Sequence, residues 1–72
     1  MNQQEKLKFI ENAIVKLFGK TLIITPDSVL IELSLDSLDI VELQMYYEDT
    51  YAVEIDDFVS IKTVQDLMDC ME

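Results

Sequence analysis

The sequence predicts an all-α fold, a small four-helix bundle with three longer helices, one short third helix and a long packed loop between the first two. Apolar residues recur at helical spacing in three segments, and no two segments offer a convincing pair of strands. The chain has 72 residues, half of them apolar, with one Gly and one Pro. This composition favours a compact unit, and the length suits one domain over residues 1–72.

An amphipathic helix is expected from Asn2 to Phe18. Gly19 follows directly and can cap its C-terminal end, because glycine readily takes the left-handed conformation found there. The apolar residues recur at spacings of three and four, so they should face the core: Leu7, Ile10, Ile14, Leu17 and Phe18.

The connection from Lys20 to Leu35 lacks clear helical periodicity. Thr21 to Thr25 has the propensity of a short strand, but an isolated strand would have no partner. We therefore expect a packed apolar loop, broken at Pro26. Three of its residues should attach it to the core: Val29, Leu30 and Leu33.

A second helix is predicted from Ser37 to Tyr51. Asp36 can act as the N-cap, and Asp39 stands where a capping partner would be. Ile40, Leu43, Tyr47 and Tyr51 follow helical spacing and should point inward. A neighbouring face interleaves apolar residues with acids: Leu38, Val41 and Met45 with Asp39, Glu42, Glu48 and Asp49.

The C-terminal part predicts two further helices. Asp56 or Asp57 could cap a very short one over Phe58 to Ser60. The last should begin at Thr63, with Asp66 as its capping partner.

The charge of the chain restricts its partners. Fifteen acids face five lysines, there is no arginine, and the formal net charge is -10. Such a chain repels nucleic acid phosphates and anionic membrane surfaces, so neither is an expected partner. Basic protein surfaces should attract it. We expect a monomer.

The residue types present do not assemble a catalytic set, so we do not expect an enzyme. The sequence lacks histidine, the commonest general base and metal ligand. No metal site is expected either, because the acids around Asp36 are interrupted by apolar residues where a calcium loop needs ligands and a central Gly. The single cysteine, Cys70, and the polar start from Met1 to Lys8, which lacks the apolar stretch of a signal peptide, favour the cytoplasm.

Ser37 has a distinctive position at the predicted start of the second helix. The first N–H groups of a helix lack internal partners, and the helix dipole favours an anion there. A phosphate ester on Ser37 would suit this position. Serine is common at helix starts, however, so position alone favours an ordinary first-turn residue.

The segment from Leu35 to Met45 resembles the phosphopantetheine attachment region of acyl carrier proteins, and Ser37 matches the modified serine. The similarity continues through Glu48-Asp49, Val53 to Ile55, and Ile61 to Asp66. The resemblance implies that a phosphopantetheinyl transferase moves the arm from coenzyme A to Ser37, and that acyl groups are then carried as thioesters. Asp36 would help to orient the transferase and its metal ion.

The resemblance also implies a docking face on the second helix. Acyl synthetases, acyltransferases, ketosynthases and similar enzymes would present basic patches to its acids. An apolar centre with a charged rim is typical of transient interfaces. The centre would be Leu38, Val41 and Met45, and the rim Asp39, Glu42, Glu48 and Asp49.

Departures from the family pattern leave the pathway open among fatty acid, polyketide and related lipid biosynthesis. Ser34 stands where the family usually has Gly, Tyr46 and Tyr47 replace small or aliphatic residues, and the stretch between Ile55 and Ile61 is short. The alternatives are a peptidyl or aminoacyl carrier, an unmodified acidic interaction module, and a nucleic-acid mimic. The last two would have no need of a hydroxyl at Ser37.

Overall fold

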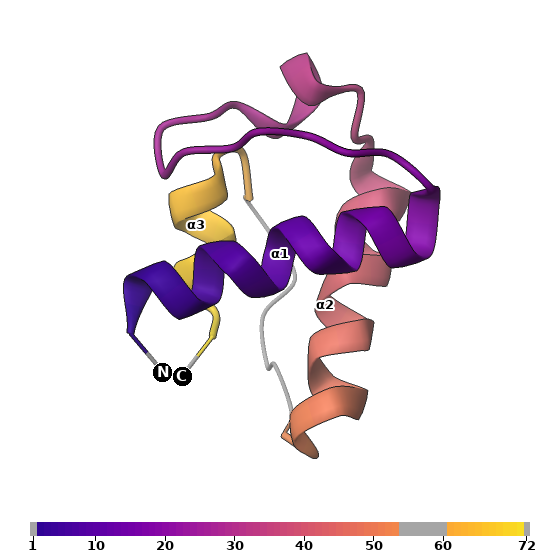
Figure 1. The fold of residues 1–72 in the computed structure, drawn as a ribbon, viewed down its shortest axis with the longest axis vertical. Coiled ribbons are helices and arrows are strands. Elements are labelled where there is room, and N and C mark those ends of the chain that lie inside the picture. Colours follow the sequence, from indigo (N-terminus) through magenta and orange to yellow (C-terminus); the bar gives the residue numbers. More distant parts are fainter. Residues whose placement is uncertain (1, 54–60, 72) are drawn as a thin grey trace.

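The computed structural model describes residues 2–53 and 61–71, and the regular structure in these ranges is helical apart from one isolated bridge. Helix α1 lies across the other two α-helices and packs against both (Figure 1). A 3-10 turn, η1, interrupts the long connection between α1 and α2. The elements in chain order are α1 Gln3–Phe18, η1 Leu30–Leu33, α2 Ser37–Tyr51 and α3 Val64–Asp69.

Local capping residues define both ends of α1, and the C-terminal cap at Gly19 is the one that the sequence predicts. The Asn2 side chain accepts a hydrogen bond from the Glu5 N–H at 2.8 Å. At the other end Gly19 has φ of 69°, and its N–H donates to the Val15 carbonyl. Both caps use backbone groups that a helix leaves unpaired at its ends.

The core lies where the three α-helices and the loop between α1 and α2 meet. Met71 continues it past α3, and its carbonyl accepts a hydrogen bond from the Lys6 ammonium at 3.0 Å, which ties the C-terminal end to α1. The buried apolar side chains are Ile10, Ala13, Ile14, Ile24, Leu30, Leu35, Leu43, Tyr47, Val64, Leu67, Met68 and Met71.

The loop between α1 and α2 is held to the start of α3 by backbone hydrogen bonds. The Leu30 N–H donates to the Lys62 carbonyl, and the Val64 N–H donates to the Ser28 carbonyl, both at 2.9 Å. These bonds flank an isolated antiparallel bridge between Val29 and Thr63. The strand propensity of residues 21–25 produces no strand, which agrees with the predicted packed loop.

One expectation about side-chain direction is wrong. Tyr51 was expected to point inward, but it is 46% exposed and its ring lies 5.4 Å from that of Phe9. Tyrosine combines an apolar ring with a polar tip, so the edge of the core suits it. Gln44 was given no role, yet it is completely buried.

The predicted short third helix, Phe58 to Ser60, and its capping acids lie outside the described residues. In the ranges 2–53 and 61–71, no helix has the length and apolarity needed to cross a membrane.

Candidate functional site

Ser37 is the first residue of α2, and the capping residues before it fix the direction of the chain. The Asp39 N–H donates to the Asp36 carboxylate at 3.0 Å, and the Asp36 N–H donates to the Asp39 carboxylate at 3.2 Å. This reciprocal capping box is the one that the sequence predicts. It leaves the Ser37 side chain exposed at the helix start.

The start of α2 favours negative charge. Unpaired N–H groups and the positive end of the helix dipole gather in the first turn. A phosphate ester on the Ser37 oxygen would therefore lie in a favourable electrostatic field. In the capping box, the Asp36 and Asp39 carboxylates already accept hydrogen bonds from two of the backbone N–H groups there.

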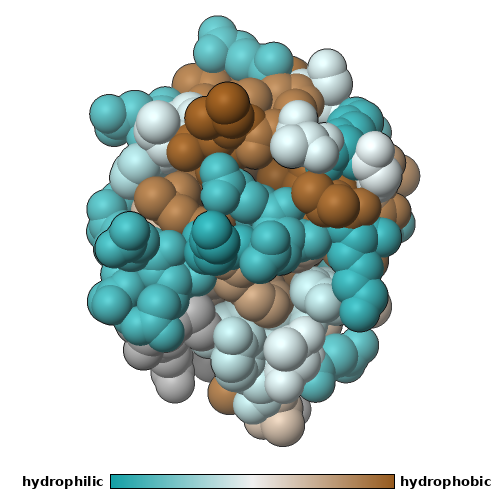
Figure 2. All heavy atoms as spheres, in the orientation of Figure 1, coloured by the Kyte–Doolittle hydropathy of each residue, from teal (hydrophilic) through white to brown (hydrophobic). Residues whose placement is uncertain are grey.

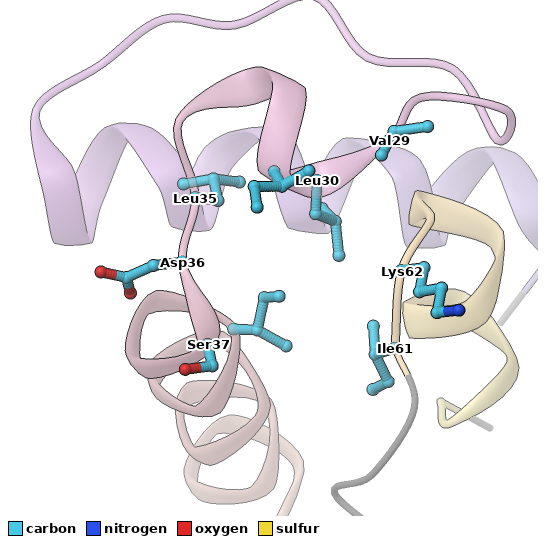
Figure 3. Close-up of a pocket in the computed structure, with 9 residues that line it drawn as sticks. Val29, Leu30, Leu35, Asp36, Ser37, Ile61 and Lys62 are labelled. Atoms are coloured by element: carbon cyan, nitrogen blue, oxygen red, sulfur yellow. The ribbon is translucent and has the colours of Figure 1, made fainter.

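A pocket of about 570 Å³ opens beside Ser37 (Figure 3). Ser37 and Asp36 lie on one side of it, and Ile61 and Lys62 face them from the segment before α3. The Asp36 carboxylate points away from the pocket. Most of the lining is apolar, and the full set is Val29, Leu30, Ile31, Leu35, Asp36, Ser37, Ile40, Ile61 and Lys62.

Sequence reasoning identified Ser37 and Asp36 but did not find the pocket beside them. Its walls come from segments that are distant in the sequence, and they meet because the bridge between Val29 and Thr63 holds them together. No local pattern around Ile61 signals this contact. In the sequence, Ile61 stands out only as part of the family resemblance.

The residues expected to form a docking face lie along α2 and differ in exposure. Leu38 is 74% exposed and Met45 is 53% exposed, whereas Val41 is half-buried. Glu42 and Asp49 are exposed, and Glu48 is half-buried. Asp39 is also half-buried, and its carboxylate is occupied by the capping box.

Further apolar side chains are exposed outside α2. Figure 2 shows them gathered above the polar outer face of α1, over the connection that leads to α2. Ile23 is exposed in this connection, and Ile31 is exposed on η1 and also lines the pocket. The sequence pattern does not indicate a surface position for either residue.

Comparisons with known proteins identify the family. The family model described as "Phosphopantetheine attachment site" matches residues 8–71. The acyl carrier protein of Rickettsia typhi is 47% identical over 64 residues, which cover 85% of this chain and 74% of that protein. This chain belongs to the acyl carrier protein family. The resemblance stated from the sequence is thereby confirmed.

Other members of the acyl carrier protein family give the same result. The protein from Syntrophobacter fumaroxidans is 50% identical over 50 residues, covering 65% of this chain and 62% of that protein, so the match spans less than two thirds of this relative. The crystal structure of the Thermotoga maritima acyl carrier protein superposes with a TM-score of 0.82 at 29% identity, covering 96% of this chain and 88% of that one.

The prosthetic group of the family is covalently attached phosphopantetheine. The described residues fit this group. An exposed hydroxyl at a helix start suits a phosphate ester. The apolar pocket beside it can bury part of a chain that is attached there.

Proposed function

We propose that Ser37 bears the phosphopantetheine arm and that the protein carries acyl groups for enzymes of fatty acid, polyketide or related lipid biosynthesis. The arm would supply a terminal thiol that holds acyl groups as thioesters. The observation that supports this most strongly is the exposed Ser37 at the start of α2, directly beside an apolar pocket.

Asp36 would serve the attachment of the arm rather than its later use. Its carboxylate points away from the pocket, so it is accessible to a transferase that approaches from outside. The capping box holds that carboxylate in one place, and a fixed carboxylate is suited to help position a transferase and its metal ion.

The pocket would shelter the first part of the acyl chain. Its volume is within the range of about 300–1,000 Å³ that small-molecule sites usually have. Placing methylene groups among Leu30, Leu35 and Ile40 removes apolar surface from water, which favours a folded-back chain. The chain would leave the pocket when a partner enzyme binds.

The docking face on α2 would bind partners that carry basic patches, including a phosphopantetheinyl transferase, acyl synthetases, acyltransferases and ketosynthases. Leu38 and Met45 would form its apolar centre with the partly covered Val41, and Glu42 and Asp49 its most exposed acids. Such a face suits short-lived complexes, since exposed charges raise association rates more than they raise affinity.

The protein itself would act as a carrier and not as an enzyme. Its location would be the cytoplasm, which the lone Cys70 suits.

Loading with an acyl group tests this function. The protein is incubated with octanoyl coenzyme A and a promiscuous phosphopantetheinyl transferase, and its intact mass is measured before and after treatment with neutral hydroxylamine. We expect one octanoyl-phosphopantetheine unit to be added, and hydroxylamine to release the octanoyl group because it cleaves thioesters.

Two variants provide the comparison. Ser37→Ala should prevent loading, whereas Ser34→Ala should load like the unaltered protein. A protein that several transferases leave unmodified would be an acidic interaction module instead of a carrier.

A further inference from the structure

Gln44 is a buried polar side chain without a partner. The residue has no exposed surface, and neither its Nε2 nor its Oε1 atom makes a hydrogen bond. Buried polar groups are nearly always paired in native proteins, so an unpaired amide calls for an explanation. A ligand that supplies the missing partner is one such explanation.

Packing alone does not account for a glutamine at this position. Gln44 lies next to Leu43, which is also buried, in the part of α2 that faces the core. A methionine would fill a similar volume with a similar flexible shape and would bury no unpaired donor or acceptor. Gln44 is also the only buried polar or charged residue among those that the structure describes.

The position of Gln44 on α2 relates it to the pocket beside Ser37. Ser37, Ile40 and Gln44 follow helical spacing and lie on one side of α2. Ile40 lines the pocket, and Gln44 lies about one turn further along α2, roughly 6 Å in the direction of the helix axis. Helical side chains lean toward the N-terminus of their helix, which directs the Gln44 side chain toward Ile40.

Gln44 does not line the pocket itself, so a chain in the pocket must pass Ile40 to meet it. Ile40 is only half-buried, so the end of its side chain can rotate about χ2 between staggered rotamers, while its β-branch restricts χ1. The axial separation of roughly 6 Å between Ile40 and Gln44 is comparable to the length of a few methylene groups. An acyl chain that folds back from Ser37 through the pocket therefore has the amide within its reach.

We propose that Gln44 determines cargo specificity by forming hydrogen bonds with a hydroxyl group on the acyl chain. A hydroxyl can accept from Nε2 and donate to Oε1, so it can satisfy both kinds of unpaired atom. A plain alkyl chain at the same place would leave both atoms unpaired. The inferred cargo class is hydroxylated acyl groups, and the inference rests on the proposed carrier function.

The test compares matched acyl chains on the same protein. Octanoyl chains that are unsubstituted or hydroxylated at carbon 3, 5 or 7 are attached through coenzyme A analogues with an amide in place of the thioester, which prevents hydrolysis and lactone formation. Intact mass first establishes loading. Melting temperatures and the NMR signals of the Gln44 side-chain NH₂ are then measured for each loaded form.

We expect at least one hydroxylated chain to raise the melting temperature by about 4–8 °C more than octanoyl does, which is the size expected for one net hydrogen bond in a domain of this length. The same chain should shift the Gln44 NH₂ signals and slow their exchange. Gln44→Met should abolish the preference, and Gln4→Met, at an exposed position on α1, should keep it.

Equal stabilisation by all four chains, or a preference that persists in Gln44→Met, would overturn the assignment of Gln44. The NMR measurement on the unaltered protein gives an independent answer, because unchanged NH₂ signals with every chain would also overturn it. Absence of loading in the first step would overturn the proposed carrier function, and this inference with it.

Discussion

At Ser34 the backbone adopts a conformation that is rare for residues with a side chain. Its φ is 64°, in the left-handed region, where the Ser34 N–H closes η1 by donating to the Ile31 carbonyl. For L-residues other than glycine this region costs about 1–2 kcal/mol, while glycine adopts it freely. The family resemblance marks Ser34 as a departure from glycine, and the structure supplies the physical reason for the usual residue.

Ser34→Gly should therefore stabilise the protein. The relief of strain exceeds the extra entropy that glycine loses on folding, so we expect a gain of about 0.5–1 kcal/mol in the free energy of unfolding. Urea titration followed by circular dichroism measures this. Ser34→Ala is the control, because it removes the hydroxyl and keeps the β-carbon, and it should give no gain. A Ser34→Gly variant that is less stable than the original would show that the conformation carries no strain.

Local sequence patterns could not predict the role of residues that depends on contacts with distant parts of the chain. Ser37 and Asp36 could be found, since the helix start and its cap are local patterns and the segment from Leu35 to Met45 resembles the attachment region of the family. Gln44 could not be, because a polar residue in an apolar pattern is normally assigned to the surface. Its burial follows from how α2 packs, which sequence spacing does not specify.

At the scale of elements, α2 provides both the site and a large part of the core. Leu43 is 1% exposed, so truncating it leaves a cavity among the buried residues. Leu43→Ala should cost about 2–5 kcal/mol in the free energy of unfolding. Since small domains have little stability in reserve, this change could unfold the protein at room temperature.

Met45→Ala is the matched control for Leu43→Ala. Met45 lies on the same helix but is largely exposed, so its truncation should cost less than about 1 kcal/mol. Denaturant titration of both variants checks the assignment of faces. Equal losses in the two variants would mean that α2 is rotated relative to the described packing.

The start of α3 should make stability depend on pH. The backbone N–H groups of Lys62 and Thr63 donate to the Asp66 carboxylate, and these bonds lower the pKa of Asp66 because they favour its charged form. A pKa lowered by folding stabilises the folded state above the ordinary aspartate range, near pH 4, and this stability is lost as the pH falls through the lowered value.

Asp66→Asn should accordingly be less stable than the original protein at pH 7, and the difference should shrink as the pH falls below about 4. Urea titrations of both proteins at pH 7, 5 and 3 measure it. A difference that stays the same at all three values would show that the charge of Asp66 contributes nothing to the cap.

The ends of the helices could be predicted because their capping signals lie within a few residues of each other. Gly19, Asp36 and Thr63 act as the sequence indicates, whereas Asn2, expected as the first helical residue, is the N-cap of α1. The η1 turn could not be predicted, because its four residues carry no periodic pattern and it depends on hydrogen bonds to the segment before α3.

At the scale of the whole molecule, the important properties are the net charge and the contacts between segments that are distant in the sequence. The net charge of -10 lies on a body with a radius of gyration of only 10.9 Å. The all-α class could be predicted from apolar spacing. The pocket could not be, since it forms only where the loop meets the segment before α3.

Reversing one charge on the docking face should affect partner association far more than folding. Glu42→Lys should slow association with a phosphopantetheinyl transferase roughly tenfold at low salt, because complementary charges steer the encounter. Its free energy of unfolding should stay within about 0.5 kcal/mol of the original, since Glu42 is exposed. Stopped-flow association and urea titration measure the two effects.

Asp27→Lys makes the same change in net charge at an exposed loop position away from α2, so it separates local from global effects. It should slow association much less than Glu42→Lys does. If the two variants slow association equally at every salt concentration, only the total charge matters and α2 is not the docking face.

Locating the added arm within the chain tests the central claim most directly. After incubation with coenzyme A and a transferase, fragmentation of the modified protein in the mass spectrometer assigns the added mass to one residue. The account predicts a single phosphopantetheine group on Ser37, with Ser28 and Ser34 unmodified. A group located on any other residue would contradict it.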